Sequence, residues 1–200
     1  MATATDKRRV ILDAAVRVFA RQGFHTCRVA DIADEAHVAY GLVYHYFSSK
    51  EQILDTLFLE RWSIMLAAIE EADASPELTG REKLGAVASF IIDSYRYDPD
   101  LMKVVIVEVT RAANTFGRTH FGQIEEAHVK VASIIAHAQQ DGAFRASVEP
   151  MFGARAFFGL IEQVLTTWIF EGVGGGAEEL ERVKTEVVEI LCGGLELPSS

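Results

Sequence analysis

Cysteine, proline and extended apolar runs are scarce in this sequence, and each scarcity excludes a class of protein. The two cysteines among 200 residues, Cys27 and Cys192, cannot form a disulfide framework. The four prolines stand between helix-like stretches or in the tail, and no strand-like alternation separates them. No apolar run is long enough to span a membrane, and no apolar segment precedes a signal-peptidase site. We therefore expect a cytoplasmic, all-α protein with no membrane partner.

Signatures of catalysis are also sparse. The chain has no phosphate-binding loop, nucleophile elbow or Rossmann glycine pattern. Glu125 and His128 have the spacing of a di-iron helix, but such a centre needs two copies and further carboxylates. His120 and His137 are too far from His128 to share one ligand face. We predict no metal, no cofactor and no enzymatic activity; a metal-binding helical enzyme and a protein-binding adapter are the weaker alternatives.

The net charge of −10 is distributed unevenly along the chain. Residues 1–50 carry seven basic and five acidic side chains, whereas residues 51–200 carry twelve basic and twenty-four acidic ones. A mildly basic N-terminal segment can face phosphate while the acidic remainder is repelled. This distribution is compatible with double-stranded DNA as the partner of the first 50 residues.

Residues 29–48 have the spacing of a helix-turn-helix. Ile32, Ala33 and Ala36 would form the inner face of its first helix, and Val43 and Phe47 would hold down the second. The residues that then face outward at the start of the second helix are Ala39, Tyr40, Gly41, Tyr44 and His45. In this motif that face enters the major groove.

The flanking sequence supports the motif. Thr5 or Asp6 can cap a preceding amphipathic helix, and Gly23 can end it. Ser49-Lys50-Glu51-Gln52 is a capping-box pattern that opens the next helix, whose N-terminus could bind phosphate with the help of Lys50.

Residues 8–54 resemble the DNA-binding domain of the TetR/AcrR family of bacterial repressors. The matching residues are Ile11-Leu12-Asp13-Ala14-Ala15, Phe19, Gly23-Phe24, Asp31-Ile32-Ala33, Val38, Val43-Tyr44, Tyr46-Phe47, Lys50 and Ile53-Leu54. Two positions depart from the family pattern. His37 replaces the usual glycine of the turn, where a positive φ is required, and Leu42 replaces the usual threonine or serine.

The resemblance implies a homodimer on a pseudo-palindromic operator and assigns roles in the first 50 residues. We expect Tyr40 and His45 to contact base edges or thymine methyl groups, and Gly41 to permit close approach of the backbone. Tyr46 and Lys50 match phosphate-binding positions of the family. The full predicted DNA-binding set is Thr26, Arg28, Ala39, Tyr40, Gly41, Tyr44, His45, Tyr46 and Lys50.

Beyond residue 50, apolar residues recur at intervals of three and four, which predicts further helices. The expected ranges are 50–74, 79–97, 99–117, 118–141, 150–171 and 178–192. The sequence thus predicts about nine helices in two domains. A three-helix DNA-binding domain would cover residues 1–50, and a helical effector-binding and dimerisation domain would cover residues 51–200. The helix over residues 50–74 starts at the first domain and is the expected lever between them.

The family resemblance also implies an effector pocket within residues 51–200. Glu108-Val109-Thr110-Arg111 and Thr166-Thr167-Trp168-Ile169 are similar to the FadR-type members, which sense long-chain acyl-coenzyme A and control fatty-acid degradation. Two arginines beside an apolar cavity would suit a ligand with an apolar chain and phosphates. The candidate pocket residues are Tyr95, Val105, Glu108, Val109, Arg111, Arg118, Phe121, Phe158, Glu162 and Trp168. A cationic drug or another small molecule is the alternative effector.

The last two expected helices suggest a dimer interface. The helix from residue 150 is apolar over most of its circumference, and the final helix has one apolar seam. Two such helices from each subunit would make a four-helix interface. The predicted interface residues are Phe157, Ile161, Leu165, Leu180, Val183, Val187, Ile190 and Leu191.

Overall fold

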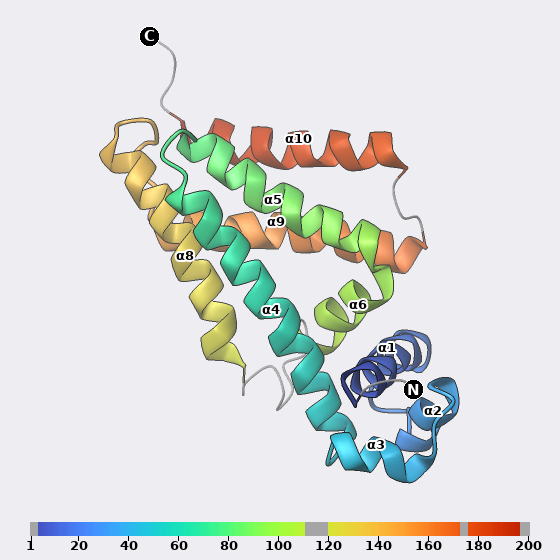
Figure 1. The fold of residues 1–200 in the computed structure, drawn as a ribbon. Helices are drawn as coiled ribbons and strands as arrows, with labels where there is room; N and C mark the ends of the chain where they lie inside the picture. Colours follow the sequence, from blue (N-terminus) through green and yellow to red (C-terminus); the bar gives the residue numbers. More distant parts are fainter. Residues whose placement is uncertain (1–3, 111–119, 173–175, 197–200) are drawn as a thin grey trace. The chain divides into compact units, whose positions relative to one another are not determined.

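The computed structural model describes residues 4–110, 120–172 and 176–196 (Figure 1), and within these ranges every element is a helix. The predicted all-α fold is thus confirmed. The nine α-helices and one π-helix of these ranges are α1 (Ala4–Gln22), α2 (Val29–Glu35), α3 (Tyr40–Tyr46), α4 (Lys50–Ala74), α5 (Gly80–Tyr97), α6 (Pro99–Val104), the π-helix η1 (Val105–Thr110), α8 (Phe121–Gln140), α9 (Pro150–Glu171) and α10 (Ala177–Leu195). Within the same ranges, no helix has the length and hydropathy needed to cross a bilayer.

Most predicted helix boundaries lie within three residues of the observed ones. The main difference concerns the helix predicted over residues 99–117, in which α-helical hydrogen bonding ends at Val104 and η1 follows. Residues 105–107 are all β-branched, and such side chains crowd the preceding turn of an α-helix. At the other end of the chain, α1 begins at Ala4, so Thr5 and Asp6 lie inside its first turn and not before it.

The helices form two compact units whose boundaries differ from the predicted division at residue 50. The first unit contains the described parts of residues 1–62 and 100–117, and the second contains those of residues 63–99 and 118–200. Ile53, Leu54 and Val104 explain the difference, because all three are buried in the hydrophobic core of the first unit. The first part of α4 and α6 from Asp100 onward therefore belong with α1, α2 and α3.

The core of the first unit is built around α1. Ile11, Leu12 and Val18 are completely buried in this core, and Phe19 packs edge-on against Phe24 with ring centroids 5.4 Å apart. α2 packs on α1, and α3 packs on α2. The result is one helix that supplies a common apolar surface for the two helices of the motif.

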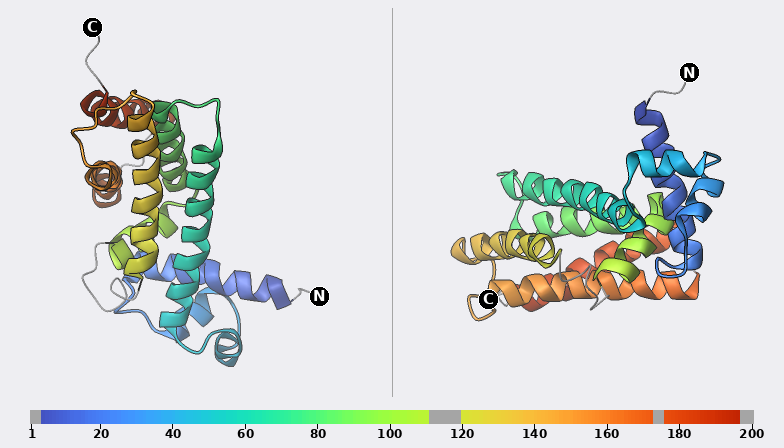
Figure 2. Two further views of the ribbon diagram at one scale, coloured as in Figure 1. Left: turned by 90° about the vertical axis from the view of Figure 1, so that its left-hand side faces the viewer. Right: turned by 90° about the horizontal axis from the view of Figure 1, so that it is seen from below.

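The second unit packs α5, α8, α9 and α10 with the second part of α4. Figures 1 and 2 show α8 beside that part of α4, and Lys130 Nζ of α8 lies 2.6 Å from a carboxylate oxygen of Glu70 on α4. α8 packs on α9, and α10 packs on α5 and α9. Lys184 of α10 reaches Asp93 of α5 at 2.7 Å. Ion pairs between helices thus supplement the apolar core of this unit.

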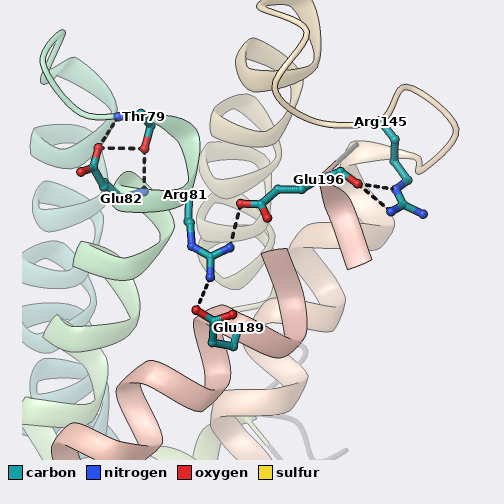
Figure 3. A network of polar contacts seen from close by, with 6 residues as sticks. All are labelled: Thr79, Arg81, Glu82, Arg145, Glu189 and Glu196. Atoms are coloured by element: carbon teal, nitrogen blue, oxygen red, sulfur yellow. Dashed lines mark hydrogen bonds and ion pairs between the residues drawn. The ribbon is translucent and has the colours of Figure 1, made fainter. Parts of the chain in front are cut away.

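A polar network joins the end of α10 to the start of α5 (Figure 3). The Arg81 guanidinium binds the carboxylates of Glu189 and Glu196, which together raise the pKa of Arg81 above its ordinary value. Arg145, from the connection between α8 and α9, donates to the carbonyl oxygen of Glu196 at 2.6 Å. Three segments distant in sequence are therefore fixed at one corner of the second unit.

Gly80 allows a close approach between the same corner and α8. A Cβ atom at this position would lie 2.5 Å from Cβ of Ala138 and 3.6 Å from the ring of Phe144. Since a Cβ–Cβ contact of this length does not occur in proteins, a larger residue would push α5 away from α8.

We predict that Gly80→Ala lowers the free energy of unfolding by about 1–3 kcal/mol, the usual cost of overpacking a core. Urea denaturation followed by circular dichroism measures this change. Gly122→Ala is the matched control, because a Cβ at Gly122 meets no atom within 4 Å. The control should leave stability unchanged or raise it by up to about 1 kcal/mol through helix propensity. Equal effects of the two substitutions would contradict the packing argument.

Candidate nucleic-acid interface

The two helices of the motif are held together by buried apolar residues. Ile32 and Ala33 of α2 are buried, and so are Val43 of α3 and Phe47 directly after it, as the spacing predicted. Arg28 N–H donates to the carboxylate of Asp31 at 2.7 Å, which anchors the first turn of α2. The inner faces of both helices are thus buried in the core of the first unit.

The turn between α2 and α3 has the predicted left-handed residue. His37 has a φ of 53°, and it is the one non-glycine residue of the described ranges with a positive φ. Asp34 C=O accepts from His37 N–H at 3.1 Å, and Ala33 C=O accepts from Val38 N–H at 3.0 Å. Histidine tolerates this conformation at a cost of roughly 1 kcal/mol relative to glycine. The departure from the family pattern therefore leaves the geometry of the turn intact.

The outer face of α3 is open to solvent. The side chains of Tyr40 and Tyr44 are 53% and 45% exposed, and Ala39, Gly41 and His45 are also exposed. A Cβ at Gly41 would meet no atom within 4 Å, so the backbone there is bare. α3 thus presents aromatic and polar groups beside an unobstructed stretch of backbone.

Tyr40 and Tyr44 form a pair on this face. Their rings are edge-on with centroids 5.1 Å apart, and the Tyr40 hydroxyl donates to the Tyr44 hydroxyl at 3.2 Å. This hydrogen bond is the main cause that raises the pKa of Tyr44 above its ordinary value. A tyrosine hydroxyl is protonated at neutral pH with or without this shift, so Tyr44 can donate to an acceptor outside the protein.

Lys50 is the predicted phosphate-binding residue whose surroundings are most informative. Its ammonium donates to the carbonyl oxygens of Phe24 at 2.7 Å, His25 at 3.3 Å and Cys27 at 3.1 Å. The same group lies 4.7 Å from the centre of the Phe24 ring. An ammonium has three donors, and all three are engaged here. Lys50 therefore holds the connection between α1 and α2 in place, a role that its position at a helix start did not suggest.

The remaining predicted DNA contacts lie at the edge of the motif. Thr26 and Arg28 are exposed, and the Thr26 hydroxyl donates to backbone carbonyls at the end of α1. Tyr46 is half-buried against the core, and its ring contacts that of His45. Their contacts with DNA stay predictions.

Two arginines of α1 position α2, although sequence analysis had not given them a role. Arg17 and Arg21 bind the two carboxylate oxygens of Glu35 at 2.7 and 3.1 Å. These hydrogen bonds lower the pKa of Glu35 below its ordinary value. The pairs are separated by 18 and 14 residues, so no helical periodicity reveals them. They connect the end of α2 to α1.

The structure brings together two of the residues predicted for the effector pocket. The rings of Tyr95 and Trp168 are both buried in the second unit, with centroids 5.5 Å apart. Phe158 and Glu162 are partly buried, and Phe121 is exposed. In the first unit Val105 is buried. Glu108 and Val109 belong to η1, but their side chains lie outside the described part of the chain, as do Arg111 and Arg118 entirely.

The predicted dimer interface needs correction. Six of its eight residues are buried within a single chain and offer no surface to a partner: Phe157, Ile161, Leu165, Leu180, Val183 and Val187. Ile190 is 67% exposed and Leu191 is half-buried. When a helix is apolar on all sides, its sequence does not indicate which side packs in the core of its own chain. The predicted residues of α9 lie on that buried side.

The exposed side of α9 instead carries residues that the prediction omitted. Phe152 and Phe170 are 68% and 73% exposed. Between them Ala156, Gly159 and Gln163 are also exposed; they follow Phe152 at intervals of four, three and four, and Phe170 comes seven residues after Gln163. We call these five residues the α9 stripe. A helical-wheel projection that separates the two sides of α9 would have revealed it.

No group of three or more metal-ligating side chains occurs in the part of the chain that the structure describes. His137 Nδ1 lies 3.4 Å from a carboxylate oxygen of Asp73, and His128 Nδ1 lies 2.9 Å from the carbonyl oxygen of Ile124. Both imidazoles thus have partners within the protein.

A helix-turn-helix with an open recognition face, joined to a larger helical unit, defines a DNA-binding transcriptional regulator. Sequence comparison is more specific. Residues 11–57 match the family described as "Bacterial regulatory proteins, tetR family", and residues 58–194 match "YsiA-like protein, C-terminal region". The chain therefore belongs to the TetR family, whose members bind DNA operators and small-molecule effectors, and it is not an enzyme.

Individual relatives extend over nearly the whole chain. The "Fatty acid metabolism regulator protein" of Bacillus subtilis is 31% identical over 186 residues, covering 92% of this chain and 93% of that protein. The transcriptional repressor KstR2 of Rhodococcus jostii is 23% identical, covering 96% and 92%.

Solved structures agree with this assignment. The regulator FadR of Bacillus subtilis, crystallised in complex with stearoyl-CoA, superimposes with a TM-score of 0.82 at 28% identity, covering 94% of this chain and 98% of that one. FadR of Bacillus halodurans has the same fold, with a TM-score of 0.85 at 24% identity over 96% of this chain and 98% of that one.

We predict that Lys50→Met lowers the free energy of unfolding by about 2 kcal/mol, because it removes three charge-assisted hydrogen bonds from one connection. The salt dependence of DNA binding should keep its slope, since the ammonium is occupied within the protein. Urea denaturation and fluorescence anisotropy at several salt concentrations measure the two quantities. A slope reduced by about one unit, with unchanged stability, would instead assign Lys50 to a phosphate.

Proposed function

We propose that this chain is a transcriptional repressor that binds a pseudo-palindromic operator as a homodimer and is released by a long-chain acyl-coenzyme A. The observation that carries the DNA-binding part is the exposed face of α3. Its inner residues are buried, while Tyr40, Gly41 and Tyr44 form one open surface. Sequence-reading helices of this motif use the corresponding face in the major groove.

Within this proposal, Tyr40 and His45 contact base edges or thymine methyl groups. The hydrogen bond from Tyr40 leaves the Tyr44 hydroxyl free to donate outward, toward a phosphate oxygen or a base acceptor. Gly41 lets the backbone approach the DNA without a side chain between them. The exposed Thr26 and Arg28 add contacts to the sugar-phosphate backbone.

The α9 stripe is the surface that we assign to the homodimer. Ala156 and Gly159 leave the centre of the stripe low, which permits two helices to approach closely, and Phe152 and Phe170 add apolar area at its ends. The exposed Ile190 and half-buried Leu191 of α10 are further apolar candidates for this interface. A two-fold dimer would place the same stripe against itself and bring two recognition helices to two half-sites.

The effector assignment depends on relatedness and on chemistry. The Bacillus subtilis regulator whose structure resembles this chain was crystallised with stearoyl-CoA. In this chain, the rings of Tyr95 and Trp168 are buried together in the second unit, and within this proposal they contact the acyl chain. Arg111 and Arg118 are the proposed partners of the coenzyme A phosphates. Helix α4, which contributes residues to both units, is the proposed lever between effector and operator.

We predict that Tyr44→Ala weakens specific operator binding by about 1–3 kcal/mol, because it removes an outward donor and an apolar contact surface from the recognition face. Fluorescence anisotropy with an operator selected from a DNA library measures this affinity. Tyr97→Ala is the control, since Tyr97 is also an exposed tyrosine but lies at the end of α5, away from the motif. Unchanged affinity of Tyr44→Ala would contradict the proposed orientation of α3.

We predict that Gly159→Arg weakens the dimer at least tenfold, because it places two charges at the centre of a two-fold interface. Analytical ultracentrifugation measures the dissociation constant. Gly122→Arg serves as control, since both glycines lie on exposed helix surface with open space around them. If the Gly159→Arg protein remained dimeric, the α9 stripe could not be the dimer interface.

We predict that stearoyl-CoA at low micromolar concentration releases the protein from its operator, whereas stearate and coenzyme A alone do not. The contrast follows because only the thioester combines the apolar chain with phosphates for the arginines. Anisotropy of the preformed complex measures release. Specific DNA binding that stearoyl-CoA does not weaken would support a DNA-binding regulator but contradict the acyl-coenzyme A assignment. The second unit would then bind another effector, such as a cationic drug.

A further inference from the structure

A cavity of about 250 Å³ opens within the first unit, between the end of α1 and the segment formed by α6 and η1. Phe19, Ala20 and Arg21 line it from α1, and Lys103, Val104 and Val107 line it from the other side. None of these six residues has a role in the proposed DNA, effector or dimer surfaces. The cavity is smaller than the pockets that hold drug-sized ligands, so it excludes a coenzyme A thioester.

The inner wall of the cavity is apolar and rigid. Phe19 and Val104 are buried members of the hydrophobic core of the first unit. Across the cavity from α1, Val107 of η1 contributes a partly buried aliphatic side chain. A short hydrocarbon group placed here would exchange water contact for contact with preformed apolar surface, which is favourable in proportion to the area covered.

The charge at the cavity comes from Lys103. Two cationic residues line it, but Arg21 already binds the Glu35 carboxylate at 3.1 Å. Lys103 lies half-buried in the last turn of α6 and has neither an ion pair nor a side-chain hydrogen bond to any residue in the described ranges. An ammonium beside an apolar wall, without an anionic partner among the described residues, is suited to one carboxylate.

The helix geometry at the cavity is also unusual. Val107 belongs to η1, where i→i+5 hydrogen bonding replaces the α-helical pattern directly after Lys103 and Val104. Short π-helical segments are rare and occur frequently at functional sites. The cavity, the Lys103 ammonium without a partner among the described residues, and the π-helix are three separate observations that coincide at one place.

We propose that this cavity is a second ligand site, which binds a small monocarboxylate with a short apolar chain. The carboxylate would pair with Lys103, and the chain would lie against Phe19, Val104 and Val107. Phosphate esters are less suitable, because a dianion would need a second free cation. Since the cavity is shared by α1 and α6, an occupant stabilises the DNA-binding unit directly. This site does not depend on acyl-coenzyme A acting in the second unit.

Sodium hexanoate is the probe, and hexanamide is its uncharged control. Ligand-observed NMR titration of the full-length protein measures both affinities. We expect millimolar or tighter binding of hexanoate, as the small size of the probe permits, and binding of hexanamide at least tenfold weaker. Lys103→Met should weaken hexanoate binding about tenfold, Lys103→Arg should largely preserve it, and Lys7→Met should leave it unchanged.

A second variant separates this site from an apolar pocket elsewhere in the protein. Val107→Trp would fill the cavity and should abolish hexanoate binding without changing operator affinity in the absence of ligand. Circular dichroism establishes that each variant is folded. The proposal is overturned if hexanoate does not bind at about 10 mM, a generous limit for so small a ligand. It is equally overturned if neither Lys103→Met nor Val107→Trp alters binding. Both results leave the acyl-coenzyme A proposal intact, because release by stearoyl-CoA is measured separately.

Discussion

The burial of Val43 and Phe47 against the first unit is the constraint on which the DNA-reading surface depends. Helix α3 has seven residues, far fewer than an isolated helix needs in water, so packing and not helix propensity keeps it formed and oriented. With one side fixed in the core, the opposite side can only face outward. Tyr40, Gly41 and Tyr44 owe their exposure to that arrangement.

Helix α1 supplies the surface that makes this constraint possible, and polar contacts keep the parts in register. Arg17 and Arg21 bind Glu35 at the end of α2, while Lys50 binds the connection that precedes α2. Individually, exposed ion pairs contribute little to stability. Here they fix the two ends of α2, the short helix on which α3 packs. Precise placement of a few side chains is what sequence recognition requires.

Much of this arrangement could be predicted because it depends on local patterns. The periodicity of apolar residues located the helices, and the motif spacing identified Val43 and Phe47 as buried and Tyr40 and Tyr44 as exposed. The family pattern required a positive φ at His37, and the structure has it. Short-range rules suffice for these features, since each one depends on residues a few positions apart.

Features that depend on distant residues could not be predicted in this way. Arg81 meets carboxylates more than one hundred residues away, and Lys50 meets carbonyl groups that no side-chain pattern reveals. The interface prediction was wrong for α9 because periodicity cannot assign the two sides of an apolar helix to core and surface. The side chains of Glu108, Val109, Arg111 and Arg118 lie outside the described residues, so their roles at the effector stay predictions.

The measurement that tests the central claim most directly is methylation interference on the selected operator. Methylation of guanine N7 modifies the major groove, whereas methylation of adenine N3 modifies the minor groove. If the exposed face of α3 reads the major groove, N7 methylation at guanines of each half-site should abolish binding, and N3 methylation there should have little effect. Interference confined to adenine N3 would contradict the account, because it would place the recognition surface in the minor groove.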